Sequence, residues 1–222
     1  MRFSQLALIL GCTAVAFGSI VPLRAEATNY QIKSGVTSVY HDLSYLSSIG
    51  LNLTGSDNTV EPINSDFIVG FGIDPTTNFT FSDTGGFIPL SGTIKHTGTV
   101  TFNNQTTVGN FSISFDSTRA INNASGLYLK DTYSLNTILF DLSAPENVTL
   151  NNNNLTINKV NLLFSPEFAK IIGNSSLAGN LAGIARIDAK VVPVNAVPEP
   201  TSTLAFLTVG LGLLLVKIKK QI

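Results

Sequence analysis

Two histidines, His41 and His96, are the side chains of this sequence best suited to bind a metal ion or to transfer a proton. Two histidines do not form a metal site by themselves, because zinc and similar ions take three or four protein ligands. His96 lies in a segment, residues 91–103, in which polar residues at odd positions alternate with mostly apolar residues at even positions. His96 shares the apolar face, which predicts a hydrogen-bonded histidine at the rim of a core.

The carboxylates are scattered singly, and most stand in or near predicted turns: Asp57, Asp66, Asp74, Asp83, Asp116, Asp131 and Asp141. No local spacing pairs two of them for acid–base catalysis on a glycosidic bond. Asp57 with Asn58, or Asp83, is an alternative Ca²⁺ site, but without a fixed-spacing calcium loop solvated turn residues are favoured. The sequence has no phosphate-binding loop, nucleophile elbow or His-Glu-x-x-His motif. We therefore expect no catalytic residue, no metal and no cofactor, in a protein that is not an enzyme.

Residues 1–27 are predicted to be a signal peptide. Arg2 supplies the positive charge, residues 6–21 are mainly apolar, and residues 25–27 offer small side chains to signal peptidase. We expect cleavage after Ala27, with Ala25 as the second choice. A lipoprotein signal at Cys12 is disfavoured, because the apolar run before this cysteine is very short and continues beyond it. Since Cys12 is the only cysteine, the mature chain then has neither disulfides nor thiolate chemistry.

The charge of the mature region argues against a nucleic-acid partner. Between residues 28 and 197 there are eight Lys and Arg against twelve Asp and Glu, which gives a net charge of −4. No basic patch is visible, and binding to nucleic acid depends on such patches. We therefore expect no nucleic acid among its partners.

The elements that hold these side chains are predicted to be short β-strands. Residues 28–192 are rich in Asn, Thr, Ser and Gly and poor in helix formers, a composition typical of β proteins. Polar and apolar residues also alternate over 111–116 and 181–191, with turn-forming residues between such runs. We therefore predict a mainly β fold, an antiparallel β-sandwich (jelly-roll-like), over residues 28–192. Its predicted core includes Ile94, Val100, Phe102, Phe111, Ile113, Phe115, Ile187 and Val191.

Little helix is predicted in this domain. Residues 165–170 are predicted to form a short helix, with serine as the cap and proline at the first helical position. Residues 41–49 are a second candidate for a helical turn. Residues 193–197 then form a short linker to the C-terminal segment.

Residues 198–222 have three parts: Pro198-Glu199-Pro200, an apolar segment over 201–216, and a basic end over 217–220. The apolar segment predicts a single hydrophobic helix of roughly 24 Å, which is shorter than a bilayer core requires. The lysines that follow it are expected to stay cytoplasmic. These parts, in this order, resemble the PEP-CTERM sorting signal of bacteria that carry exosortases. The resemblance implies that an exosortase, a membrane-embedded cysteine enzyme, recognises the tripeptide and removes the tail.

A second resemblance covers residues 91–100 and 111–116. These segments are similar to Hta-type haem-uptake domains, in which a strand ends in His-x-Gly and a tyrosine is the axial ligand in an exported β-sandwich. The resemblance implies His96 as a haem-site residue, with Tyr40 or Tyr45 as the axial ligand. The same stretch also resembles the body of cyanobacterial PEP-CTERM proteins without an assigned activity.

The sequence therefore predicts an exported cell-surface or extracellular-matrix protein with a structural or adhesive, non-catalytic role. Its expected partners are signal peptidase, an exosortase, the cell membrane through the C-terminal helix, and exopolysaccharide. The alternative is a ligand-binding β-sandwich module for a carbohydrate or for haem. The absence of Trp counts against sugar binding, because aromatic faces stack on sugar rings.

Overall fold

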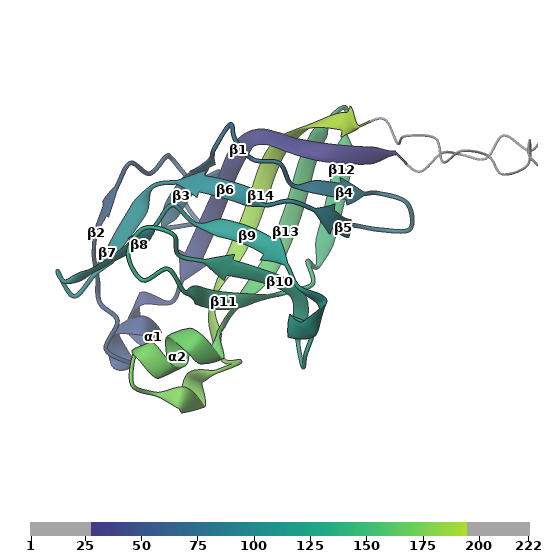
Figure 1. Ribbon diagram of the computed structural model, residues 1–222. Coiled ribbons are helices and arrows are strands. Elements are labelled where there is room, and N and C mark those ends of the chain that lie inside the picture. Colours follow the sequence, from purple (N-terminus) through teal and green to yellow (C-terminus); the bar gives the residue numbers. More distant parts are fainter. Residues whose placement is uncertain (1–27, 195–222) are drawn as a thin grey trace, which may run out of the picture.

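The structure, a computed structural model, describes residues 28–194, which are built mainly of β-strands (Figure 1). The strands of this part are β1 (Asn29–His41), β2 (Leu53–Asp57), β3 (Val69–Ile73), β4 (Thr80–Ser82), β5 (Ile88–Ser91), β6 (Ile94–Thr97), β7 (Thr99–Phe102), β8 (Thr106–Gly109), β9 (Ser112–Phe115), β10 (Ala124–Lys130), β11 (Ile138–Ser143), β12 (Asn147–Asn151), β13 (Asn154–Phe164) and β14 (Leu181–Val194). The helices are α1 (Leu43–Ser48), α2 (Pro166–Ile171) and two short 3₁₀ turns, η1 (Ser117–Arg119) and η2 (Ser175–Leu177).

Eight of these strands pair into a closed antiparallel ring. Its order is β1-β3-β6-β9-β10-β11-β13-β14, and β14 pairs again with β1. β4 and β5 extend the sheet beyond β1, and β12 extends it beyond β13. β2, β7 and β8 form a separate sheet, which lies at one end of the ring in Figure 1. In the same view β1, β14 and β13 cross behind β6, β9 and β10, so the two layers enclose an interior.

The prediction of a mainly β, antiparallel fold is confirmed, but the two separate sheets of a sandwich are replaced by a barrel-like fold. The cause is that long strands take part in both layers. β1 pairs with β14 along its length and with β4 and β3 on its other side, and its register against β14 shifts between Ile32 and Ser34. The register of β13 against β14 shifts in the same way, between Ile157 and Val160. Such irregularities bend a strand, which lets one strand pass from layer to layer and closes the sheet edge.

The strand predicted over residues 91–103 is in fact two strands, β6 and β7, which belong to different sheets. The break is at Gly98, whose φ of 104° is favourable only for glycine. A Cβ atom at this position would also lie 2.9 Å from the carbonyl oxygen of Asn58. Gly98 therefore allows the chain to leave the ring and to form the small sheet at its end.

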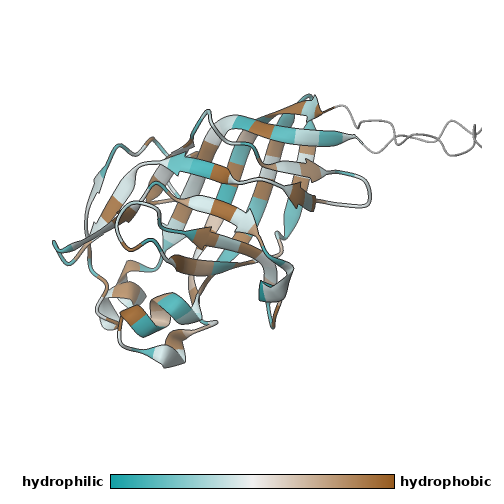
Figure 2. Ribbon diagram, viewed as in Figure 1, coloured by the Kyte–Doolittle hydropathy of each residue, from teal (hydrophilic) through white to brown (hydrophobic). Residues whose placement is uncertain are grey.

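Figure 2 shows hydrophobic and hydrophilic residues alternating along β1, β13 and β14, and the hydrophobic ones fill the interior. Of the predicted core, Phe102 is half-buried, and the buried members are Ile94, Val100, Phe111, Ile113, Ile187 and Val191. Phe115 was predicted wrongly, because its side chain is 45% exposed. The strand register is not the cause, since Ile113 on the same face is buried. β9 ends at Phe115, and its ring lies beside Gly126 instead of entering the core.

Both predicted helical segments are present, as α1 and α2. The hydroxyl of Ser165 caps α2 by accepting a hydrogen bond of 3.0 Å from the N–H of Phe168, and Pro166 begins the helix. Asp42 caps α1 by accepting from two backbone N–H groups of its first turn. Serine and aspartate caps of this kind explain why such short helices start where they do.

Candidate functional site

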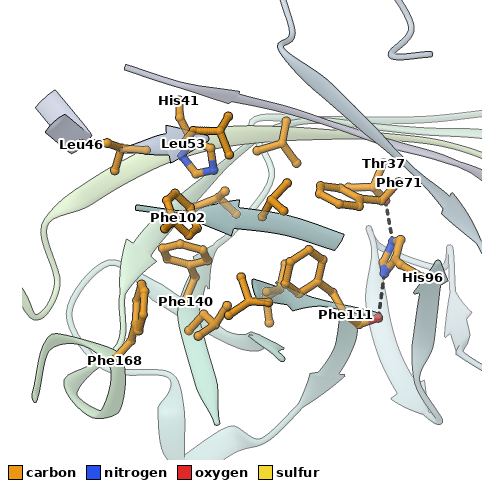
Figure 3. A pocket seen from close by; sticks show the side chains of 16 residues that line it. Thr37, His41, Leu46, Leu53, Phe71, His96, Phe102, Phe111, Phe140 and Phe168 are labelled. Carbon is orange, nitrogen blue, oxygen red and sulfur yellow. Dashed lines mark hydrogen bonds between the residues drawn. The ribbon is translucent and has the colours of Figure 1, made fainter. Parts of the chain in front are cut away.

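An apolar cavity of about 50 Å³ lies inside the ring, between the layers of strands and the two helices (Figure 3). Only three of its lining residues, Thr37, His41 and His96, have polar side chains. The full lining is Thr37, Val39, His41, Leu46, Leu53, Phe71, His96, Val100, Phe102, Val108, Phe111, Leu129, Leu139, Phe140, Leu162 and Phe168. We call this space the interior cavity.

One end of the interior cavity is formed by Thr37, His96 and Phe111, which we call the floor. All three residues are buried. The Nδ1–H of His96 donates to the carbonyl oxygen of Phe111 at 3.1 Å, because a carbonyl can only accept. Its Nε2 then accepts from the hydroxyl of Thr37 at 2.7 Å. Both ring nitrogens therefore make hydrogen bonds, as predicted for His96, but the residue lies inside the core and not at its rim.

Burial also fixes the charge of His96. Removal of the ring from water lowers the pKa of His96 to about 4, and the hydrogen bond to Phe111 opposes this only in part. The imidazole is therefore neutral at physiological pH. A neutral ring with both nitrogens hydrogen-bonded is suited to holding β6 to β1 and to Phe111, the residue before β9, and not to moving protons.

The tyrosines that the haem resemblance implied are not brought to His96. Tyr40 follows the alternation of β1 and points outward, with 41% of its side chain exposed, whereas Val39 and His41 on either side line the interior cavity. Tyr45 is half-buried in α1 and is not part of the lining. An interior cavity of about 50 Å³ is also far smaller than a porphyrin. The residues present at this site do not fit haem.

The opposite end of the interior cavity, which we call the rim, consists of His41, Leu53, Phe102 and Phe140. These side chains are half-buried, in contrast to the floor. Figure 3 shows them on the side of the cavity away from His96, near Leu46 of α1 and Phe168 of α2. The more exposed lining residues therefore lie at the helical end of the ring, although Leu46 and Phe168 of the helices are themselves buried.

His41 received no role from the sequence, and it is the polar residue of the rim. Its Nδ1–H donates to the carbonyl oxygen of Ala182 at 2.8 Å. This bond fixes the tautomer, because the carbonyl requires a donor, and leaves a lone pair on Nε2. Burial lowers the pKa of His41, with the bond to Ala182 as a smaller opposing effect, so the ring stays neutral. The signal in the sequence was its inward position on β1, two residues after Val39.

The helix α2 is fastened to the ring by an arginine. Arg119 of η1 donates to both oxygens of Glu167 in α2, at 2.8 and 3.0 Å. The same guanidinium donates to both oxygens of Asp141 in β11, at 2.6 and 3.1 Å. Phe168, the next residue of α2, packs on Phe140 of the rim with ring centroids 5.9 Å apart. This cluster therefore helps to hold one side of the rim in place.

Replacing Glu167 by Gln is expected to lower the free energy of unfolding at pH 7 by about 0.5–1 kcal/mol, the range of partly exposed pairs. Hydrogen bonds from Arg119 lower the pKa of Glu167. A lowered carboxyl pKa gives stability that is present above the unfolded value, about 4.3, and is lost as the pH falls through the folded value. The difference between wild type and variant in urea unfolding should therefore shrink below about pH 4.

Glu146→Gln is the matched control for this experiment. Glu146 also pairs with a cation, Lys159, but both side chains are mostly exposed. We expect no measurable change in its free energy of unfolding. Equal losses for the two variants at pH 7, or a loss at Glu167 that does not shrink as the pH falls, would contradict this role of Glu167.

The remaining carboxylates that the structure describes are not gathered into a cluster. Within residues 28–194, no three metal-ligating side chains come together. Asp57, an alternative calcium ligand, accepts from the side-chain amide of Asn58 at 2.9 Å in an exposed turn. Asp131, predicted as a turn residue, is fully buried and accepts hydrogen bonds from five backbone N–H groups.

Two larger hollows have volumes of about 310 and 470 Å³. The first has a mixed lining of polar and apolar residues, and all the side chains that line the second are polar. Asp141 borders the first and is bound to Arg119. Asp74 borders the second and accepts from the N–H and hydroxyl of Thr76. Because their carboxylates are already engaged, we assign the candidate site to the interior cavity.

The sorting residues Pro198, Glu199 and Pro200 lie outside the described residues, as do the signal peptide and the apolar tail. β14 continues through Val194, two residues into the linker expected at 193–197. In the part of the chain that the structure describes, no helix is long and apolar enough to cross a membrane.

Comparisons with known proteins give a likeness at the level of structure and none at the level of sequence. No protein-family model matches the sequence. No curated protein matches it either. Among solved structures, the C-terminal domain of HtaA from Corynebacterium glutamicum is similar over 73% of this chain and 99% of that chain, with a TM-score of 0.46 and 11% sequence identity. With so low a TM-score and sequence identity, this similarity gives no information about a ligand of this chain.

Proposed function

We propose that the β domain of this protein binds a small apolar ligand in the interior cavity. The observation that supports this function is the cavity itself. A space of about 50 Å³ exceeds the roughly 15 Å³ that one water needs, yet its lining offers few polar partners, so it is expected to stay dry. At about 24 cal/mol per Å³, an empty space of this size costs roughly 1.2 kcal/mol of stability, which a fitting ligand recovers.

The architecture agrees with this function. Rings of eight strands have an interior that side chains just fill or that holds one small ligand. The half-buried rim gives the ligand a path from solvent, and the buried floor ends that path. Because thirteen of the sixteen lining residues are apolar, the cavity favours an apolar group and does not favour a carbohydrate. A cavity that encloses a whole benzene ring measures about 150 Å³. The interior cavity, at about 50 Å³, therefore takes one end of a small ring or of an aliphatic chain, and the rest of the ligand lies between the side chains of the rim.

A titration of the purified protein with toluene tests this function. We expect a dissociation constant on the order of 0.1–1 mM for a ligand with so few atoms. At ten times that concentration, the midpoint of thermal unfolding should rise by about 3–5 °C. Glucose, as a probe of the carbohydrate alternative, should cause no shift. A shift with glucose and none with toluene would replace the proposed function by sugar binding.

We also propose that the chain is exported and sorted by an exosortase, as the segment over 198–222 indicates. The support is the order of its three parts, with lysines after the apolar residues that keep the far end cytoplasmic. In this arrangement Pro198-Glu199-Pro200 stands on the outer side of the membrane. The ligand-binding domain would then work at the cell surface or in the extracellular matrix, with exopolysaccharide around it.

Glu199→Ala is expected to stop sorting in a host that has an exosortase. The wild-type protein should appear outside the cell, lighter by its tail, whereas the variant should remain in the membrane at full length. An immunoblot of the medium and membrane fractions measures this. Glu61→Ala, a change in an exposed loop of the β domain, is the control and should be released like wild type. Release of Glu199→Ala in the processed form would overturn the sorting proposal.

A further inference from the structure

We propose that His41 makes the interior cavity selective for apolar ligands that carry a phenol-type hydroxyl, which donates a hydrogen bond to Nε2 of its imidazole. This inference rests on the proposed function of the cavity. It adds the chemical class of the ligand and the orientation in which the ligand is held.

The first step is the state of the polar groups around the cavity. At the floor, the hydroxyl of Thr37 donates to Nε2 of His96, and Nδ1–H of the same ring donates to the carbonyl of Phe111. Neither nitrogen of His96 is therefore open to a ligand. At the rim, Nδ1 of His41 is committed to Ala182. Within residues 28–194, Nε2 of His41 makes no hydrogen bond to protein, and it is the one side-chain nitrogen of the lining left in this condition. Since no buried side-chain nitrogen or oxygen of these residues lacks a partner, Nε2 is reached by solvent at the rim.

The second step is what this nitrogen can recognise. Because Nδ1 carries the proton, Nε2 is an acceptor and requires a donor from the ligand. A ketone, an aldehyde or an ionised carboxylate offers only acceptors and would leave Nε2 facing another lone pair. An ammonium group is a donor, but its charge is costly to place beside Phe140 and the other apolar lining residues. A neutral hydroxyl on an apolar body meets both requirements.

The third step is orientation. His41 belongs to the rim, with its ring 6.1 Å from that of Phe140, centroid to centroid. The apolar space extends from there to the floor, as Figure 3 shows. The hydroxyl of the ligand therefore stays at the rim, and its apolar part points toward Phe111.

The position of the His41 ring is itself built into the fold. Gly183 of β14 stands directly against the ring, and a Cβ atom at that position would overlap Nδ1 and the carbonyl oxygen of Tyr40. The glycine and the bond to Ala182 together hold the imidazole in one place. A preorganised acceptor of this kind gives selectivity because a ligand without a donor displaces water from Nε2 and leaves this nitrogen without a partner.

The test compares phenol with toluene, which differ by a hydroxyl in place of a methyl group. The quantity measured is the ratio of their dissociation constants, by calorimetry, in wild type and in His41→Asn. The amide Nδ2 of asparagine can keep the bond to Ala182, whereas the acceptor at the Nε2 position is lost. We expect the ratio to move about tenfold toward toluene in the variant. The ratio is the quantity compared because His41 lines the cavity, so its replacement also alters the affinity for toluene.

The outcomes separate this inference from the proposed function. If both compounds bind wild type and the ratio is the same within twofold in His41→Asn, the role of His41 is overturned while the cavity function stands. If neither compound binds wild type, the proposed function fails and the inference fails with it. Should the variant not fold, ¹⁵N NMR of the wild type decides. The Nε2 resonance of His41 should shift with phenol and stay unchanged with toluene, and equal behaviour with both would refute the inference.

Discussion

Replacing Asp131 by alanine is expected to lower the free energy of unfolding by ~3–5 kcal/mol. Asp131 follows β10 and is fully buried. Its Oδ1 accepts from the N–H of Gly109 at 2.7 Å and of Tyr133 at 3.1 Å. Its Oδ2 accepts from the N–H groups of the next three residues, 134 to 136, at 2.6 to 3.2 Å.

The expected loss is large because one side chain satisfies five backbone donors. Alanine would leave these donors without partners, and a buried donor without a partner costs about 1–3 kcal/mol. The bonds also hold the turn after β10 to the end of β8, where Val108 lines the interior cavity. Urea unfolding at pH 7, followed by circular dichroism, measures the loss.

Asp116→Ala is the matched control, because Asp116 also accepts hydrogen bonds from a turn, at the start of η1, but is exposed. We expect a much smaller loss there, since water can replace the missing acceptor. Similar losses for the two variants would show that the buried carboxylate of Asp131 has no special role.

Replacing Val108 by phenylalanine is expected to abolish toluene binding, with affinity weakened at least ~20-fold. Val108 is buried and faces the interior cavity, so the larger ring takes the space that the ligand would occupy. Overpacking of this kind costs about 1–3 kcal/mol, which a domain of ordinary stability tolerates. Calorimetric titration with toluene, after the fold has been checked by circular dichroism, gives the result.

Val192→Phe adds the same atoms on the outer face of β14, where the side chain is 40% exposed. Its toluene affinity should equal that of wild type. Toluene binding that survives in folded Val108→Phe would mean that the ligand binds elsewhere, and loss of binding in both variants would point to a general effect on the protein.

Local patterns were sufficient to predict the strands and their inward faces. Phe111 and Ile113 are buried as their alternation predicted, and the cap at Ser165 starts α2 where it was expected. Phe115 shows the limit of the pattern. Alternation predicts which face of the strand a side chain lies on. Whether the opposite layer of strands covers that face at Phe115 depends on tertiary packing.

Closure of the ring and the interior cavity were beyond prediction for a related reason. They depend on pairing between β1 and β14, which are separated by most of the domain, and on the register shifts that bend β1 and β13. The roles of single polar residues follow from the same long-range contacts. Asp131 looked like any turn aspartate, and Nε2 of His41 became the free acceptor only because Ala182 and Gly183 of β14 lie against its ring.

The measurement that tests the central claim most directly is a crystal structure of the protein soaked with bromobenzene, which has nearly the shape of toluene. The proposed function predicts an anomalous bromine peak inside the ring, between the floor at His96 and the rim at Phe140. The same crystals of Val108→Phe should lack it. An interior cavity without bromine in wild-type crystals, with the compound found only on the outer surface or not at all, would contradict the assignment of this protein as a binder of small apolar ligands.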